Sequence, residues 1–434
     1  MSSTTSKGST SGRGLSRRRL LQTAAAGAGA VVVPQFFPGL RLSKPAWAAN
    51  GVVKMGASLP LTGTYEKVSK IYRDAYEFWT ETLGGKLQVA GQELPVEWTI
   101  YDDENQAPRT AQLTEKLIND DKVDLIVGTY GTDTVLAQGA IAKKYGRITV
   151  QAGAASSRVD DEIGGTATFT IVGSSKVYPA TAMDYLAARE PKPQRVGIII
   201  MDDAVYQEMA QGVREKCAEH GMEVVFEEVL PSKGDIDLRP TALKLKNAGD
   251  IDILYNTGWD LICIKLVQEM KALDVNVKAL VGGHLTTNPV VKETLGKDLD
   301  GVYGVTLWLP TLAWKDPHFA SPMDFSDKFK AAKGYAPTYH AAMAYTACVA
   351  YESVLKDASG ENPFDADAMR AALFALKTET VFGPLAFNEK GRNSGAGAPA
   401  LQWQGSDPSY VVLAPEAVKT GEGVYPVPAW KDRA

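Results

Sequence analysis

Short apolar runs separated by amphipathic stretches dominate the chain from residue 52 onward. The runs typical of strands lie at residues 52–59, 96–101, 123–127 and 147–151. The segments with the spacing of amphipathic helices lie at residues 72–83, 107–120 and 133–145. Apolar strands that alternate with single helices are typical of a parallel sheet covered on both faces. This part of the chain is therefore predicted to form an α/β unit.

A second series of the same kind begins near Ser174. Its predicted strands lie at residues 195–201, 222–230, 251–256 and 278–281, and its predicted helices at 178–188, 207–220, 237–248 and 261–273. One more predicted strand at 301–308 leads into long helices at 322–333 and 338–357 and a final αβ segment at 367–387. Two such series in one chain predict two α/β lobes with sheets of parallel type.

The first 48 residues have the pattern of an export leader. Arginines in Ser16-Arg17-Arg18-Arg19-Leu20-Leu21 precede an apolar run at 23–33, and Ala46-Trp47-Ala48 gives a small-x-small cleavage pattern. This is the bacterial twin-arginine address, and its apolar run is too short to span a membrane. The alternative is a disordered basic leader on a cytosolic protein. We expect the twin-arginine export machinery as a partner, cleavage near Ala48, and a periplasmic protein.

Charge and composition exclude several classes of function. The leader holds seven basic residues and no acid, so its removal changes the formal net charge from −5 to −12. An acidic body argues against nucleic acid and anionic membranes as partners. The cysteines, at positions 217, 263 and 348, have no metal-ligand spacing and allow at most one disulfide, and free thiols are favoured. The four histidines form no metal motif, so neither a metal nor another cofactor is expected.

Ligands of open parallel sheets bind outside the carboxyl ends of the strands, so the strand-to-helix turns are the candidate sites. The turn after Val127 contains Tyr130 and Thr132, and the hydroxyl and N–H groups there could hold a carboxylate. The alternative is that Thr132 or Asp133 only caps the following helix. Asp133 also brings a negative charge that would compete with an anionic ligand.

The turn after Gln151 consists of small residues, among them Gly153, Ala154, Ala155 and Ser156. Small residues let a ligand approach the backbone closely, although they are equally typical of a tight turn.

Aromatic side chains also follow the predicted strands of both series. Tyr130 belongs to the first series, whereas Tyr206, Trp259 and His284 belong to the second. A single aromatic residue at such a place is usually packing. Four of them from two lobes predict an aromatic-lined cleft.

The order and spacing of several stretches resemble the type I periplasmic binding proteins of branched-chain amino acid/amide ABC transporters, such as leucine/isoleucine/valine-binding proteins. The matching stretches are KMGASLPLTG (54–63), IYDDENQAPRTAQLTEKLI (100–118), VDLIVGTYGT (123–132), QAGAASS (151–157), RVGIIIMDDAVY (195–206), FGPLAFNEKG (382–391) and QWQ…VYPVPAW (402–430). The resemblance covers nearly the whole chain after the leader.

The resemblance implies two Rossmann-like lobes joined by three hinge crossings, near Val172, at 301–304 and near Thr378. The first lobe would comprise residues 52–172 and 303–378, and the second 173–302 and 379–414, with an irregular tail at 415–434. In this family the ligand binds between the lobes, which close over it. A membrane permease then recognises the closed form.

The resemblance also implies roles for single residues in the first lobe. Thr132 matches the hydroxyl that takes the ligand carboxylate, and Gly153 matches a position whose backbone assists. Ala155 lies where amino-acid binders use a hydroxyl, so this contact is lost unless Ser156 supplies it.

In the second lobe, Tyr206 matches a cleft tyrosine and Trp259 an aromatic position. His284 lies where the amino-acid binders place an acid for the ligand's α-ammonium group. An imidazole cannot replace a carboxylate as the partner of an ammonium group. We therefore expect a carboxylate, aromatic acid or amide rather than a standard α-amino acid.

The function expected is an extracytoplasmic solute-binding protein that delivers its ligand to an ABC importer. A periplasmic ligand sensor for a signalling partner would share this fold. A secreted α/β enzyme is the third alternative, but the chain contains no GxSxG motif and no GxGxxG motif that opens a helix after a strand. No residue is therefore expected to be catalytic.

Overall fold

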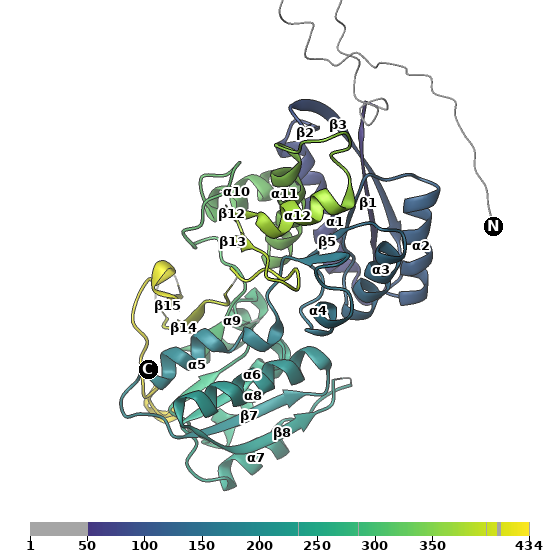
Figure 1. Ribbon diagram of the computed structural model, residues 1–434. Helices are drawn as coiled ribbons and strands as arrows, with labels where there is room; N and C mark the ends of the chain where they lie inside the picture. The colour runs from purple at the N-terminus through teal and green to yellow at the C-terminus, as the bar shows by residue number, and fades with distance from the viewer. Residues whose placement is uncertain (1–50, 233, 285, 396, 406–408, 434) are drawn as a thin grey trace, which may run out of the picture. The chain divides into compact units, whose positions relative to one another are not determined.

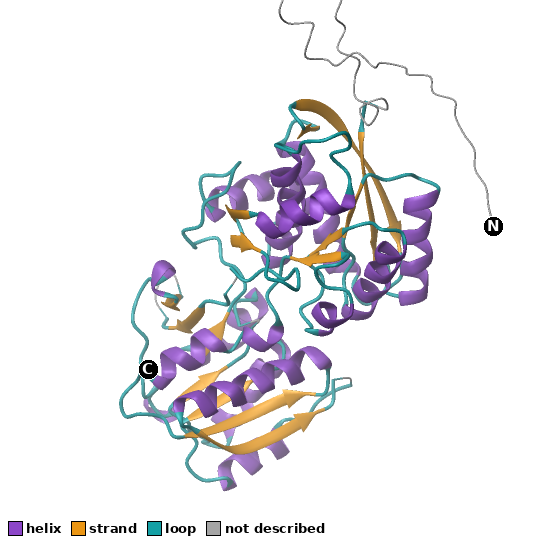
Figure 2. Cartoon of the chain, in the orientation of Figure 1, coloured by secondary structure: helices purple, strands orange, loops and turns teal. Residues whose placement is uncertain are grey.

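The computed structural model describes residues 51–433 except residues 233, 285, 396 and 406–408 (Figure 1). The predicted export leader and its cleavage site near Ala48 lie outside these residues. The described part of the chain contains two large sheets and one two-stranded sheet, and helices surround them (Figure 2). No helix in this part is both long and apolar enough to cross a membrane.

The first sheet has six strands in the order β2-β3-β1-β4-β5-β6. Its strands are β1 (Val53–Leu59), β2 (Lys86–Val89), β3 (Gln92–Asp102), β4 (Leu125–Val127), β5 (Thr149–Gln151) and β6 (Thr168–Thr170). Its helices are α1 (Glu66–Thr82), α2 (Ala107–Asn119), α3 (Thr132–Lys144) and α4 (Arg158–Glu162). All pairs are parallel except the hairpin of β2 and β3, which the sequence analysis did not predict.

The second sheet has seven strands in the order β15-β14-β11-β10-β9-β7-β8. Its strands are β7 (Arg195–Met201), β8 (Glu223–Leu230), β9 (Ile253–Asn256), β10 (Ala279–Val281), β11 (Tyr303–Val305), β14 (Ala400–Trp403) and β15 (Tyr410–Ala414). Its helices are α5 (Ala180–Ala187), α6 (Ala204–His220), α7 (Arg239–Asn247), α8 (Asp260–Ala272) and α9 (Pro289–Leu295). Figure 1 shows α6 and α7 on opposite sides of β7 and β8. Strands β14 and β15 add an antiparallel edge to an otherwise parallel sheet.

The segment after β11 returns to the first sheet. It forms α10 (Pro322–Lys333), α11 (Tyr339–Leu355), α12 (Ala366–Ala375), β12 (Lys377–Thr380) and β13 (Gly383–Ala386). Helix α11 is almost wholly buried and packs on α1 and β5. Near its end, the Tyr351 hydroxyl lies 2.9 Å from the carbonyl oxygen of Ile126 and 3.0 Å from that of Ile148. This helix is therefore part of the core of the first lobe.

Strand pairing places two of the three lobe crossings later in the chain than expected. Strand β11 pairs with β10 and β14, so residues 303–305 belong to the second sheet rather than the first lobe. Arg392 forms a bridge with Thr170 at the edge of the first sheet, so the chain returns to the second sheet only after this point, not near Thr378. Val172 lies directly after β6, and the crossing expected there stays a prediction. Apolar runs predict a strand but do not reveal which sheet it joins.

The predicted irregular tail at 415–434 contains no α-helix or strand in its described residues. Its Trp430 is 7% exposed and donates its ring N–H to the carbonyl of Val275 at 2.7 Å, which fixes the tail on the second lobe. Cys217, Cys263 and Cys348 are buried free thiols, as the sequence favoured. Burial raises the pKa of the Cys217 thiol to about 11 and that of Cys263 to about 12.

Candidate functional site

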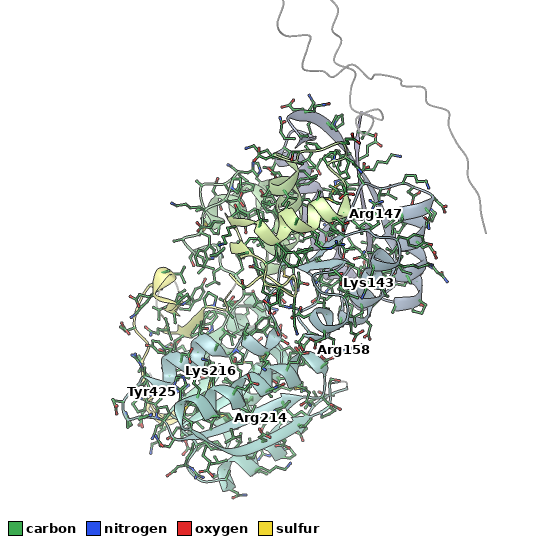
Figure 3. The ribbon with its side chains drawn as sticks, viewed as in Figure 1. Lys143, Arg147, Arg158, Arg214, Lys216 and Tyr425 are labelled. Atoms are coloured by element: carbon green, nitrogen blue, oxygen red, sulfur yellow. The ribbon has the colours of Figure 1, made fainter. Side chains whose placement is uncertain are left out.

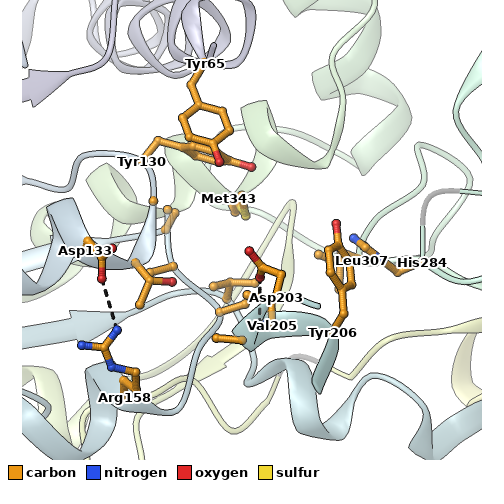
Figure 4. Close-up of a pocket in the computed structure, with 18 of the residues that line it drawn as sticks. Tyr65, Tyr130, Asp133, Arg158, Asp203, Val205, Tyr206, His284, Leu307 and Met343 are labelled. Atoms are coloured by element: carbon orange, nitrogen blue, oxygen red, sulfur yellow. Dashed lines mark hydrogen bonds and ion pairs between the residues drawn. The ribbon is translucent and has the colours of Figure 1, made fainter. Parts of the chain in front are cut away.

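Turns at the carboxyl ends of both sheets enclose a cavity of about 440 Å³ (Figure 4). This is where parallel sheets present a ligand site. Its lining residues are Tyr65, Asn105, Tyr130, Gly131, Thr132, Asp133, Ala152, Gly153, Ala154, Ala155, Arg158, Val172, Tyr178, Asp203, Ala204, Val205, Tyr206, His284, Leu307, Tyr339 and Met343. Both lobes therefore contribute to its wall.

The turn between β4 and α3 brings a helix N-terminus to the cavity. Gly131 has a φ of 108°, a conformation that glycine adopts without strain, and it directly precedes α3. The buried Thr129 hydroxyl donates to Asp103 at 2.7 Å and fixes the turn. Thr132, the first residue of α3, lines the cavity. Because the first N–H groups of a helix have no partner within it, this end offers hydrogen-bond donors and a partial positive charge to an anion.

The turn after β5 packs tightly against the turn after β4. A Cβ atom on Gly153 would lie 2.0 Å from the carbonyl oxygen of Thr129, so no side chain fits there. The N–H of Ala154 donates to the Gln151 side chain at 3.0 Å. The next N–H, that of Ala155, has no hydrogen-bond partner among the described residues. Ala155 lines the cavity, so this N–H is a candidate donor to a ligand.

The second-lobe side of the cavity is built from side chains. Asp203 caps α6, because its carboxylate accepts a hydrogen bond from the N–H of Val205 at 3.1 Å. The ring of Tyr206 lies 6.1 Å from that of His284 and 5.8 Å from that of Trp259, between centroids. His284 is 8% exposed, and its Nδ1 has no hydrogen-bond partner among the described residues. Figure 4 shows His284 reaching toward Tyr206.

A cluster of aromatic side chains forms part of the cavity wall on the first-lobe side. The ring of Tyr130 lies 5.2 Å from Tyr65 and 5.5 Å from Tyr72, between centroids. Its hydroxyl lies 3.2 Å from Nε2 of His340, and the His340 ring stacks on Tyr339 at 3.9 Å. Tyr65, Tyr130 and Tyr339 line the cavity, so much of its wall is aromatic.

Burial keeps the aromatic polar groups of the cavity uncharged near neutral pH. It raises the pKa of every lining tyrosine, namely Tyr65, Tyr130, Tyr178, Tyr206 and Tyr339. It lowers the pKa of His284 to about 4, and that of His340 to about 3 with a further contribution from His284. A neutral imidazole has one donor and one acceptor nitrogen. The aromatic part of the wall thus presents phenols and an uncharged imidazole.

Three lining residues carry a formal charge, and two of them form an ion pair. Arg158 (Figure 3) lies 3.1 Å from the Asp133 carboxylate, as the dashed line in Figure 4 shows. The Asp133 side chain is 79% exposed. The negative charge that was expected to compete with an anionic ligand is therefore hydrated and paired. The third charged residue, Asp203, is also exposed.

Seven of the nine residues that the sequence proposed for the site line this cavity: Tyr130, Thr132, Gly153, Ala154, Ala155, Tyr206 and His284. The other two are not among its lining residues. Ser156 is fully buried and its hydroxyl donates to Glu208 at 2.7 Å, so this hydroxyl does not replace the one that Ala155 lacks. Trp259 packs beside Tyr206. Contact of the seven with a ligand remains a prediction.

Sequence reasoning missed several lining residues. Tyr65 and Asn105 lie in the turns after β1 and β3, so the strand-end rule could have found them. Asp203 lies in the turn after β7, three residues before Tyr206, and could have been found in the same way. Tyr178 and Tyr339 precede α5 and begin α11, and neither follows a strand. No strand-end signal marks these two residues.

One group of metal-ligating side chains occurs in the described residues, formed by Asp184, Glu219 and His220. It lies at the surface of the second lobe, outside the cavity. The Lys216 ammonium group (Figure 3) lies 2.9 Å from each of the two carboxylates and competes with any cation. The group therefore supports no metal assignment.

Two α/β lobes with a shared cavity at the carboxyl ends of their sheets define a solute-binding protein. A profile of the periplasmic binding protein family matches residues 52–407, and the chain belongs to this family. The resemblance inferred from the order of its motifs is thus confirmed. The family is one of binding proteins rather than enzymes, and membership implies a periplasmic location.

A curated relative is the Leu/Ile/Val-binding protein homolog 8 of Brucella suis biovar 1 (strain 1330). It is 24% identical over 398 residues, which cover 87% of this chain and 94% of the relative.

Two similar solved structures come from Rhodopseudomonas. The solute-binding protein of an ABC transporter from R. palustris, in complex with benzoate, is 21% identical with a TM-score of 0.65, covering 85% of this chain and 99% of that one. A solute-binding protein from Rhodopseudomonas palustris BisB5, in complex with 3,4-dihydroxybenzoic acid, is 20% identical with a TM-score of 0.68, covering 85% and 98%. These likenesses show the fold, and the predicted type I architecture is confirmed.

Proposed function

We propose that this chain captures a small aromatic carboxylate in the cavity and delivers it to an ABC importer. The observation that carries the proposal is the arrangement of the wall. Unpaired backbone donors lie on the first-lobe side, and an uncharged, buried histidine among tyrosines lies on the second. Such a wall matches a ligand with one anionic group and an apolar ring.

The carboxylate would bind at the first-lobe side. The N-terminus of α3 at Thr132 and the free N–H of Ala155 are the donors there. Hydrogen bonds to a charged group contribute about 1.5–3 kcal/mol each when both partners are otherwise desolvated. No lining side chain needs to carry a full positive charge, since the helix end supplies a partial one.

The ring of the ligand would lie against Tyr206 and His284. Aromatic rings pack favourably in offset or edge-to-face contacts, and the neutral imidazole offers one donor and one acceptor to a ring hydroxyl. A neutral imidazole can accept a hydrogen bond from a buried ammonium group but carries no negative charge to balance it. The two similar proteins solved with benzoate and 3,4-dihydroxybenzoic acid are consistent with this ligand class.

An α-amino acid is the second candidate, and Asp203 favours it. This carboxylate lines the cavity and could pair with an α-ammonium group. The name of the Brucella relative points the same way. Asp203 is exposed, however, whereas His284 is buried, so an ammonium group at Asp203 would stay partly hydrated. A surface ion pair of this kind contributes only about 0–1 kcal/mol.

The test is calorimetric titration of the chain without residues 1–48, stripped of ligand by unfolding and refolding. The panel is benzoate, 4-hydroxybenzoate, 3,4-dihydroxybenzoate, leucine and benzylamine. We expect binding of at least one aromatic acid, weaker or no binding of leucine, and none of benzylamine. Preferred binding of leucine, lost in Asp203→Asn, would instead establish the amino-acid alternative.

Export and delivery are tested separately. Replacement of Arg17, Arg18 and Arg19 by lysine should retain the protein in the cytoplasm if the twin-arginine pathway exports it. N-terminal sequencing of the exported protein should begin near Ala49. Deletion of the gene for this chain should abolish uptake of the bound acid, whereas deletion of a sensor would leave the transport step itself intact.

A further inference from the structure

A buried arginine from a distant part of the chain holds the cavity loop formed by residues 152–157. Arg392 is 3% exposed and reaches this loop from the segment after β13. Its Nη2 donates to the carbonyl of Ser156 at 2.8 Å and its Nη1 to that of Val172 at 3.0 Å. Nη1 also lies 3.5 Å from the carbonyl oxygen of Ala154. Ala154 and Val172 line the cavity, whereas Arg392 does not.

The charge of Arg392 is balanced by Asp160 on α4. Nε of Arg392 lies 2.6 and 2.8 Å from the two carboxylate oxygens, and the Asp160 side chain is 11% exposed. Burial raises the pKa of the Asp160 carboxyl, and the guanidinium group counteracts this effect. Because the guanidinium has five N–H donors in a rigid plane, it can hold the carboxylate and the loop carbonyls at once.

Glu208 on α6 holds the same loop from the second lobe. Its carboxylate accepts hydrogen bonds from the Ser156 hydroxyl at 2.7 Å, the Ser157 N–H at 3.0 Å and the Ser175 hydroxyl at 2.9 Å. The carbonyl of Ser156 is thus bound by Arg392, and that of Ala154 is shared between Arg392 and Nε2 of Gln151, which lies 3.4 Å away. Glu208 binds a loop hydroxyl and a loop N–H. The N–H of Ala155, between these anchors, keeps no partner among the described residues.

We propose that Arg392 is a positioning residue for ligand binding. By holding the carbonyls of Ala154 and Ser156, it keeps their lone pairs away from the cavity and turns the intervening N–H of Ala155 toward the bound anion. A released carbonyl could rotate toward the cavity and repel a carboxylate. The inference rests on the proposed function, because the ligand carboxylate is the group to which this N–H would donate.

The deciding variant is Arg392→Lys. A lysine keeps the charge opposite Asp160 but lacks the planar set of donors for the carbonyls. We expect affinity for benzoate to fall about tenfold, as for the loss of one well-placed hydrogen bond to a charged group. The urea midpoint should change little. Calorimetry and urea denaturation measure the two quantities.

Two control variants separate positioning from general stability. Asp160→Asn removes the ion pair but leaves the guanidinium on the carbonyls, so the urea midpoint should fall while affinity stays within about twofold. Arg370→Lys changes an arginine on α12 that also donates to a backbone carbonyl, that of Thr166 at 2.9 Å, away from the cavity. It should alter neither quantity. Equal losses of affinity in Arg392→Lys and Asp160→Asn would overturn the proposal.

Hydrogen exchange of the protein without ligand gives a readout that does not need the ligand's identity. Arg392→Lys should exchange faster in the peptide that contains residues 152–158, and Arg370→Lys should not. Unchanged exchange in Arg392→Lys would overturn the proposal. If the unmodified protein binds none of the aromatic acids, the proposed function fails, and the exchange result still decides whether Arg392 holds the loop.

Discussion

The two sides of the cavity are built on different principles. On the first-lobe side, tyrosines such as Tyr130 also line the wall, but the candidate donors for a carboxylate belong to the backbone. Buried partners such as Gln151 and Arg392 hold the turn from behind. On the second-lobe side, the surface consists of side chains, above all Tyr206 and His284. Backbone donors recognise a functional group common to many ligands, whereas side chains distinguish one ligand from another. Substitutions on the second side should therefore change specificity most.

His284→Glu tests this difference with the largest expected effect. A glutamate would place a negative charge across the ring from the ligand carboxylate, roughly 6–7 Å away. At an effective dielectric constant of about 20, the repulsion is about 2–3 kcal/mol, or on the order of 100-fold in affinity. Calorimetry at pH 8, where the glutamate is ionised, measures it.

The matched control for this variant is His284→Gln, which stays neutral and should bind aromatic acids within about tenfold of the unmodified protein. Full affinity in His284→Glu at pH 8 would place His284 outside the ligand site and refute the comparison.

Tyr206→Ala should cost about 2 kcal/mol of binding free energy, because it removes an aromatic contact from the cavity wall. Trp259→Ala should cost less than half as much, since Trp259 packs beside Tyr206 and is not among the lining residues. Tyr206→Phe keeps the ring and serves as the control. A larger loss in Trp259→Ala than in Tyr206→Ala would show that Trp259 itself faces the ligand.

Acid should destabilise the protein through the second-lobe wall. Burial lowers the pKa of His284 from 6.5 to about 4. Between these pH values the unfolded chain binds a proton that the folded protein does not, so stability is complete above about pH 6.5 and falls on acidification. His284 alone should lower the free energy of unfolding by about 2 kcal/mol between pH 7 and pH 5.

Urea denaturation at the two pH values, compared with His284→Gln, isolates this contribution. His340, whose pKa burial also lowers, adds a slope of the same sign in both proteins. An equal slope in both proteins would mean that His284 titrates normally when folded.

Thr132→Val should have the smallest effect, about 1 kcal/mol of binding free energy. It removes one hydroxyl at nearly constant volume, and the cap of α3 is Gly131, so the helix should remain intact. Calorimetry with benzoate measures the loss. Unchanged affinity would mean that the backbone alone holds the carboxylate, which would sharpen the contrast between the two sides.

Sequence patterns predicted the fold because each parallel strand carries its own signal. The apolar run at β7, for example, is buried along nearly its full length and has only one plausible role. Sequence patterns failed where pairing with another strand decides which sheet a segment joins. Strand β11 joins the second sheet through pairs with β10 and β14, and β2 exists only as the hairpin partner of β3.

The site was predictable where residues follow strands, as Thr132 and Tyr206 do. Ser156 shows the limit of this rule. Its position in the turn suggested a ligand contact, but its hydroxyl is bound by Glu208, which lies 52 residues later in the chain. The contacts of Arg392 could not be predicted from the sequence for the same reason, since its partners lie more than 200 positions away in the chain.

Helix α11 limits how this protein can be converted into a sensor for new compounds. Its first turns supply Tyr339 and Met343 to the cavity. Tyr351, near its other end, donates to the carbonyls of Ile126 in β4 and of Ile148, which directly precedes β5. A library that randomises Tyr339 or Met343 would alter α11, a helix in the core of the first lobe. Directed evolution should instead sample the turns around Tyr206 and His284, where an altered side chain leaves that scaffold intact.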